Sequence, residues 1–196
     1  MTGDPRTVRA RVSFLAVLDR YVAAHPMERA CVDRMRAFVR THADCFERSC
    51  RDGHLTGSAW VLSPDHARVL LVHHRKLGRW LQPGGHADGE VALLRVAQRE
   101  AREESGLANL TVVAAGLGSL PLDLDVHAIP ARDDEAAHTH YDVRYLLVAR
   151  GDEPLLPSPE SHAVRWVPRD RLTDMDVDDS VLRLDRKAGA VLPAGG

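Results

Sequence analysis

The sequence predicts an α/β fold with a mixed sheet, preceded by an N-terminal helical hairpin. Three observations predict it. The first stretch of about 40 residues places apolar side chains at helical spacing, the chain after Gly57 changes to short β-type runs bounded by turns, and one amphipathic helix interrupts those runs. Strands combined with a central and a terminal helix favour a layered α/β domain over a helical bundle or an all-β barrel.

Two helices are expected in the N-terminal region. The first runs from Pro5 to about Ala24, with apolar residues Val8, Val12, Leu15, Leu18 and Val22. Pro26 ends it, and a second fits Met27 to Arg40, with Ala30, Cys31, Met35 and Phe38 facing inward. We therefore divide the chain into a helical extension, residues 1–46, and a main domain, residues 47–196. A hairpin this small is expected to pack on the main domain or in a homodimer contact, as a structural cap or as an aid to substrate selection.

The main domain is read from its apolar runs and turn residues. Strands are expected at Ser58–Leu62 and Arg68–His73, joined as a hairpin, and later at Leu110–Ala115, Leu122–Ile129, Tyr141–Ala149 and Ala163–Val167. A polar loop is expected over residues 131–140, and a terminal helix over Asp178–Lys187. The central helix is expected to begin near Glu90, to bury Leu93, Leu94, Ala97 and Ala101, and to end at Gly106.

Composition and charge exclude several classes of protein. The 196 residues carry a formal net charge of −2, which predicts no binding to nucleic acid or to anionic membranes. No apolar run reaches the roughly 20 residues that span a bilayer, and the acidic start around Asp4 is unlike a signal peptide. The odd number of cysteines, Cys31, Cys45 and Cys50, indicates reduced thiols and a cytoplasmic location.

Three glutamates at the end of the central helix form the main chemical signal. Glu100, Glu103 and Glu104 stand at positions i, i+3 and i+4, which puts them on one face of a helix. Like charges at this spacing repel by roughly 0.2–0.5 kcal/mol per pair. Glu100 and Glu104 flank the apolar stripe, while Glu103 lies further round. A divalent cation would neutralise this cluster.

The stretch from Gly85 to Leu107 resembles the Nudix box. That signature reads Gly, five residues, Glu, seven residues, then Arg-Glu-apolar-any-Glu-Glu-any-Gly-apolar. Arg99 to Leu107 matches its second half, and Gly85 is correctly spaced from it. One position departs, because the first Glu of the box falls on Val91 while Glu90 lies one residue earlier.

The resemblance implies a Nudix-type α/β/α sandwich that hydrolyses a nucleoside diphosphate linked to another group, with Mg²⁺ or Mn²⁺ as cofactor. It implies that Glu100 and Glu104 are the main metal ligands and that the Gly85 carbonyl completes the site. Glu103 would be a further ligand or the base that activates water. Arg99 would pair with a carboxylate and hold the turn and helix in shape.

Side chains outside the box are candidates for the substrate or for other ions. We predict that His86, Arg75, His140 and Glu160 contact the substrate. His138 and His140 alternate at a strand entrance and should point to the same side, so a metal or phosphate site there, including a Zn²⁺ site with another histidine, stays open. A site joining Cys45 and Cys50 to His42 or His54 also stays open, beside the simpler reading of structural thiols. Trp80 and Tyr141 are expected to pack in the core or to stack on a base.

The predicted function is pyrophosphate hydrolysis on a small nucleotide-type substrate. A nucleotide-binding or sensor module with little hydrolysis is the alternative, supported by Val91 at the first glutamate position of the box. A non-nucleotide pyrophosphate, such as an isoprenyl or inositol compound, is a third reading, and the near-neutral charge gives little support to inositol substrates.

Overall fold

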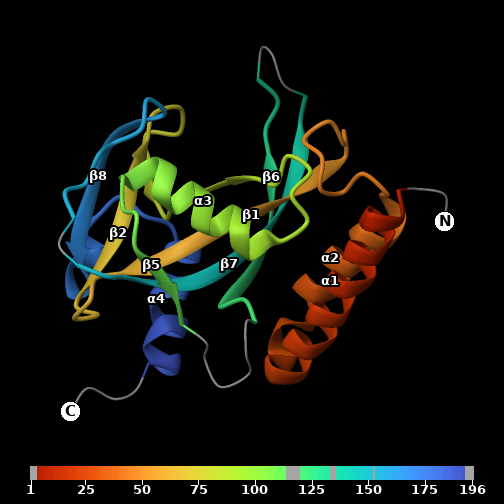
Figure 1. Ribbon diagram of the computed structural model, residues 1–196, viewed down its shortest axis with the longest axis horizontal. Coiled ribbons are helices and arrows are strands. Elements are labelled where there is room, and N and C mark those ends of the chain that lie inside the picture. Colours follow the sequence, from red (N-terminus) through yellow and green to blue (C-terminus); the bar gives the residue numbers. More distant parts are fainter. Residues whose placement is uncertain (1–3, 114–119, 133–135, 152, 193–196) are drawn as a thin grey trace. The chain divides into compact units, whose positions relative to one another are not determined.

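The computed structural model describes residues 4–113, 120–132, 136–151 and 153–192. In chain order it contains α1 (Pro5–Ala24), η1 (Pro26–Glu28), α2 (Arg29–Thr41), β1 (Gly53–Leu62), β2 (Arg68–His74), β3 (Arg79–Leu81), β4 (Gly84–His86), α3 (Leu93–Ser105), β5 (Leu110–Val112), β6 (Asp123–Ile129), β7 (His138–Ala149), β8 (Ser161–Pro168), η2 (Arg169–Asp174) and α4 (Asp179–Val191) (Figure 1). The α/β fold class, with a mixed sheet and two N-terminal helices, is confirmed.

The strands form one sheet of eight strands within the described residues. Its main path is β3-β2-β1-β7-β5, with β4 paired to β1, β6 paired to β7 and β8 paired to β2. The predicted hairpin is present, because β1 and β2 are antiparallel with Leu62 opposite Val69. The antiparallel pair of β2 and β8 places His74 opposite Ser161, so the residues that follow β2 lie beside those that precede β8.

The predicted elements are present with shifted boundaries. The first strand of the main domain begins at Gly53 rather than Ser58, and β7 begins at His138, which shortens the predicted polar loop. The central helix begins at Leu93 rather than Glu90. Strands β3 and β4 were not predicted, because three residues give too little alternation to identify a strand. The end of the strand predicted over Leu110–Ala115 and residues 133–135 of the predicted loop lie outside the described residues.

The chain divides into two compact units, which we describe separately. Unit 1 comprises Met1–Gly57, His86–Val96 and Leu124–Val143, and unit 2 comprises Ser58–Gly85, Ala97–Asp123 and Arg144–Gly196. The division proposed from the sequence, after residue 46, stays a prediction.

In unit 1, helices α1 and α2 lie side by side (Figure 1). The predicted apolar stripe of α1 was partly wrong, because Val12 is 57% exposed whereas Phe14, Leu18 and Tyr21 are buried. The bulkier aromatic residues set the inward face, which rotates Val12 outward. Ala30 in α2 is also exposed, and Val32 is buried in its place.

Unit 2 contains a hydrophobic core. Buried side chains from β1, β2, β7, β8 and α4 form it, among them Trp60, Leu62, Leu71, Leu146, Val181 and Leu184. The C-terminal helix docks on this core through Val181 and Leu184. Trp80 packs against this cluster, in agreement with the core-packing reading, and its ring also stacks on His73 at 4.9 Å.

Candidate functional site

The end of α3 presents its glutamates to unequal extents. The side chain of Glu100 is 14% exposed and that of Glu103 is 58% exposed. Glu104 is partly buried. This is the arrangement expected from helical geometry, with Glu103 furthest from the apolar stripe. The helix ends at Gly106, whose positive φ of 77° is the conformation that closes many helices.

The glycine turn before α3 touches these carboxylates directly. The Gly84 N–H donates a hydrogen bond of 2.9 Å to Glu104 Oε2. A Cβ added at Gly85 would lie 2.5 Å from Cδ of Glu100, and one at Gly84 would lie 2.3 Å from Oγ of Ser58. Glycine is therefore required at position 85 by the approach of the backbone to Glu100 on the helix, and at position 84 by its approach to Ser58 on β1.

The charge of Glu104 is poorly compensated by the protein. Burial raises the pKa of Glu104 to about 7; the hydrogen bond from Gly84 lowers this pKa, and repulsion from Glu100, Glu160 and Glu103 adds to the increase. No lysine or arginine within the described residues forms an ion pair with Glu104. The carboxylate therefore lies among other carboxylates in a partly desolvated position, which a bound cation would stabilise.

Arg99 lies on the exposed side of the cluster. Its Nη1 is 2.8 Å from Glu100 Oε1 and 3.3 Å from Glu103 Oε2. The expected pairing of Arg99 with a carboxylate is thus observed, and it involves two of them. Such a pairing fixes the carboxylates relative to the helix axis.

Arg75 and Glu160 are brought together by the pairing of β2 with β8. The Arg75 N–H donates a 3.0 Å hydrogen bond to the Glu160 carbonyl, and Arg75 Nη2 lies 3.4 Å from the carbonyl oxygen of Ser161. Both side chains are exposed. Since the Glu160 charge raises the pKa of Glu104, the beginning of β8 supplies a fourth carboxylate to the glutamate cluster. The sequence predicted Glu160 as a substrate contact, but its place beside Arg75 follows from the register of β2 and β8.

His86 and His140 belong to unit 1, where they meet other histidines. The ring of His54, which is 2% exposed, lies 4.8 Å from His86, 4.9 Å from His138 and 4.8 Å from His140 between centroids. The prediction that His138 and His140 point to the same side is confirmed, because their Nε2 atoms are 3.1 Å apart. His54 was considered only with the cysteines, since nothing local links it to residues on β7.

The cysteines do not take part in this grouping. Burial raises the pKa of Cys45 to about 12 and that of Cys50 to about 11, so both are inert structural thiols. His42 instead faces Asp52, with Nε2 and Oδ2 2.9 Å apart. Tyr141 stacks on Phe38 with 3.9 Å between ring centroids, in agreement with a packing role.

The departure from the box at Val91 has a local structural setting. Val91 is 40% exposed and lines a cavity of about 240 Å³ together with Arg11, Glu47 and Gly89. Glu90 accepts a 2.8 Å hydrogen bond from the Ala92 N–H just before α3. The side chain of Glu90 therefore accepts a backbone hydrogen bond at the start of the helix.

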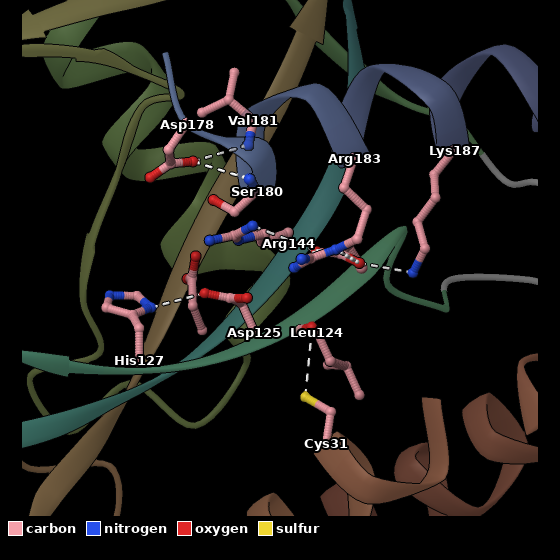
Figure 2. Close-up of polar contacts among 12 residues, drawn as sticks. Cys31, Leu124, Asp125, His127, Arg144, Asp178, Ser180, Val181, Arg183 and Lys187 are labelled. Carbon is pink, nitrogen blue, oxygen red and sulfur yellow. Dashed lines mark hydrogen bonds and ion pairs between the residues drawn. The ribbon is translucent and has the colours of Figure 1, made fainter. Parts of the chain in front are cut away.

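A further polar cluster of unit 2 was missed from the sequence. Asp123 has a fully buried side chain and pairs with Arg144 Nη1 at 3.3 Å, Arg183 Nη2 at 2.9 Å and Lys187 Nζ at 2.6 Å. Figure 2 shows the three cationic side chains directed toward one another from β7 and α4. Basic residues at positions 183 and 187 of a helix are common on solvated faces, so they carried no signal.

The fold and the glutamate cluster define a class of α/β protein in which a glycine turn and a helix gather carboxylates suited to a hard divalent cation. The comparison with known families identifies that class. The NUDIX domain model matches residues 54–185, and the chain belongs to this family. No curated protein matches the chain.

Solved structures agree on the fold. A NUDIX-family hydrolase from Clostridium perfringens aligns with a TM-score of 0.56 at 21% identity, over 71% of this chain and 98% of that one. An Ap4A hydrolase from C. elegans, in a binary complex, aligns with a TM-score of 0.55 at 16% identity, over 69% and 95%. A Nudix hydrolase from M. smegmatis gives 0.52 at 22% identity, over 74% and 90%. At these identities the likeness concerns the fold alone.

None of the helices described is both long enough and apolar enough to span a bilayer.

Proposed function

We propose that this protein hydrolyses the pyrophosphate bond of a nucleoside diphosphate linked to another group, with Mg²⁺ or Mn²⁺ as cofactor. The observation that carries the proposal is the partly buried carboxylate of Glu104, held on the glycine turn and surrounded by three other carboxylates. Membership of the Nudix family supports it. The proposed substrate is a small nucleotide, and the proposed location, from the three thiols, is the cytoplasm.

The residues present fit a hard cation. Mg²⁺ and Mn²⁺ prefer oxygen ligands, and the cluster offers carboxylate oxygens from Glu100, Glu104 and Glu103 together with the backbone of Gly85. Glu100 and Glu104 would be the main ligands, and the Gly85 carbonyl would add one more. When bound, the cation lowers the pKa of water and neutralises charge on the phosphate groups.

The reaction replaces one bond to phosphorus by another. Water attacks a phosphorus of the pyrophosphate, a new P–O bond forms, and the bond from that phosphorus to the bridging oxygen breaks. Glu103 is the most exposed of the three helical carboxylates and is proposed as a further ligand or as the group that takes the proton from water. Arg99, which holds Glu100 and Glu103, is proposed to keep both in position.

Two side chains of unit 2 are proposed to contact the substrate. Arg75 offers an exposed cation for a phosphate, and Glu160 lies next to it in the strand pair. His86 and His140 belong to unit 1, and the expectation that they contact the substrate stays a prediction.

The test is a hydrolysis screen with Mg²⁺ and Mn²⁺ over nucleoside triphosphates, ADP-ribose, dinucleotides and nucleotide-sugars. Repeating the reaction in ¹⁸O-water and measuring the masses of the products shows which phosphorus is attacked. On a substrate that the parent protein cleaves, we expect Glu103→Gln and Glu104→Gln to lower turnover by at least about 100-fold with an unchanged circular dichroism spectrum. Unchanged turnover in both variants would contradict the proposal.

Glu153→Gln is the matched control. This exposed carboxylate binds the Ala108 N–H and the Asn109 side chain, away from the groups assigned to the reaction. We expect its turnover to equal that of the parent protein.

The second candidate is a nucleotide-binding or sensor module with weak or no hydrolysis. Its support is Val91, which replaces a carboxylate of the box and lines a cavity instead. Calorimetry that detects nucleotide binding, with no phosphate bond broken across the whole panel in either metal, would favour this function over the first.

A further inference from the structure

Five histidines of unit 1 converge on one face of neighbouring strands. His86 comes from β4, His54 from β1, His127 from β6, and His138 and His140 from β7. Strand β4 pairs with β1 and β6 pairs with β7, and β1 and β7 are neighbours, so the four strands lie in succession. Their imidazole rings contact one another, and we call this group the histidine cluster.

Three members bring their ring nitrogens to ligand spacing. One nitrogen from each of His54, His138 and His140 lies within 4.8 Å of the other two. In the described part of the chain, no other three or more histidines, cysteines or acidic residues do so. The Nε2 atoms of His138 and His140 are 3.1 Å apart. Two nitrogens bound to one tetrahedral Zn²⁺ at the usual bond length are about 3.3 Å apart, so little movement is needed.

Hydrogen bonds fix which nitrogens carry lone pairs. His138 Nδ1 lies 2.9 Å from the carbonyl oxygen of Ala136, and a carbonyl only accepts, so Nδ1 holds the proton. In the neutral ring, His138 Nε2 then accepts the 3.1 Å hydrogen bond from the Nε2–H of His140, so a metal ion bound between these two nitrogens would displace that proton. His127 Nδ1 is held in the same way by Asp125 Oδ2 at 2.8 Å. Metal-binding histidines in proteins are typically oriented by such a bond to a carbonyl or carboxylate.

The surroundings favour neutral imidazole. His54 is 2% exposed and the rings of its neighbours lie within 4.9 Å of it, so protonating several of these rings would bring like charges close together. Neutral imidazole is the form that binds metal ions. Of the five histidines, His54 is buried and the others are partly buried, and bringing imidazoles out of water costs desolvation energy that apolar side chains of similar size would not.

We propose that His54, His138 and His140 form a binding site for a transition-metal ion, with Zn²⁺ as its preferred occupant. His86, whose ring lies 4.8 Å from His54 and 5.2 Å from His140, is the nearest candidate for a fourth ligand. Imidazole nitrogens suit Zn²⁺, whereas Mg²⁺ requires oxygen ligands. The histidine cluster shares no residue with the glutamate cluster, so this site goes beyond the proposed hydrolysis and does not depend on it.

The test is a Zn²⁺ titration of the untagged full chain, stripped with EDTA and then freed of chelator, with no nucleotide present. We expect one Zn²⁺ per chain by calorimetry and elemental analysis, and visible absorption bands of tetrahedral type when Co²⁺ is used instead. The double variant His138→Ala/His140→Ala should lower Zn²⁺ affinity by at least about 100-fold. Should it fail to fold, His54→Gln and His140→Gln, made singly, take its place.

Two controls make the result specific. His66→Asn removes a histidine outside the cluster at a position with φ of 59°, which asparagine tolerates, and should bind Zn²⁺ as the parent does. Glu100→Gln/Glu104→Gln should also keep full Zn²⁺ affinity. Absence of stoichiometric Zn²⁺ binding by the parent, its survival in the folded histidine variants, or its loss in the glutamate variant would each overturn the proposal.

Discussion

Two carboxylates of unit 2, Asp123 and Glu104, differ in how far the protein compensates their negative charge. Asp123 forms ion pairs with Arg144, Arg183 and Lys187. Burial alone would raise its pKa, but hydrogen bonds from Arg183 and the charges of Lys187 and Arg144 hold the pKa below its ordinary value. Glu104 receives one backbone hydrogen bond, and its pKa is raised to about 7.

The difference indicates a structural role for Asp123 and agrees with the proposed ligand-binding role of Glu104. The chain supplies the counter-charge of Asp123 itself, so this carboxylate joins β6 to β7 and α4 within the fold. At Glu104 the chain adds further negative charge from Glu100, Glu103 and Glu160. This gathering of like charges in a partly desolvated place supports the proposal that a cation binds there.

The largest expected effect is the loss of stability on substitution of Asp123. Asp123→Asn leaves buried Arg144 and two further cations without their anion, so we expect the free energy of unfolding to fall by about 3–5 kcal/mol. Chemical denaturation measures this. Asp185→Asn, which breaks a more exposed pair between α4 and Arg169 of η2, is the control and should cost about 1 kcal/mol or less. A loss as small at Asp123 would show that its cations do not depend on it.

The second effect concerns the pH dependence of stability without metal. The folded pKa of Glu104, about 7, exceeds its ordinary value of 4.5, so between these pH values the folded state binds the proton more tightly than the unfolded state. In EDTA, stability should therefore fall as pH rises from 4.5 to 7, by up to about 3 kcal/mol from this group.

Glu104→Gln isolates this contribution. The variant lacks the titrating group, so the difference in unfolding free energy between it and the parent should grow across this pH range. Saturating Mg²⁺ should restore the stability of the parent at the higher pH, because the ion stabilises the ionised carboxylate. A pH-independent difference would show that Glu104 is already compensated by the protein.

The smallest effect tests the contact between the turn and the helix. In Gly85→Ala the new Cβ would lie within 2.5–2.7 Å of the Glu100 carboxyl group, so the turn and the helix must separate. We expect a loss of about 1–3 kcal/mol in stability and a weaker affinity for Mn²⁺, measured by denaturation and calorimetry.

Gly189→Ala is the matched control, because it makes the same substitution at a position where the added methyl group has room. Its nearest neighbour would be the flexible end of Arg169 at 3.4 Å, and alanine favours the helix, so stability should be unchanged or higher by up to about 1 kcal/mol. Equal results at both glycines would mean that the contact of Gly85 with Glu100 is unimportant.

The sequence predicted much of the fold and part of the candidate site. The limits of α1 were correct, and most strands were found, because these elements depend on local periodicity. The inward face of α1 was partly wrong at Val12, since the larger residues Phe14 and Tyr21 outweigh valine in packing. Strands β3 and β4 were not predicted, because they are strands through pairing with the longer β2 and β1 and not through a pattern of their own.

What the sequence by itself determined is the glutamate cluster on α3 and the glycine turn before it. Their spacing within one helix and one turn fixes their geometry, whatever the rest of the chain does. Tertiary structure alone decided which distant residues join each cluster. Asp123 meets partners 21, 60 and 64 positions away, and His54 meets His138 and His140 across two strands. Such contacts depend on strand order and register, because a shift of one residue would turn each side chain to the other face of the sheet.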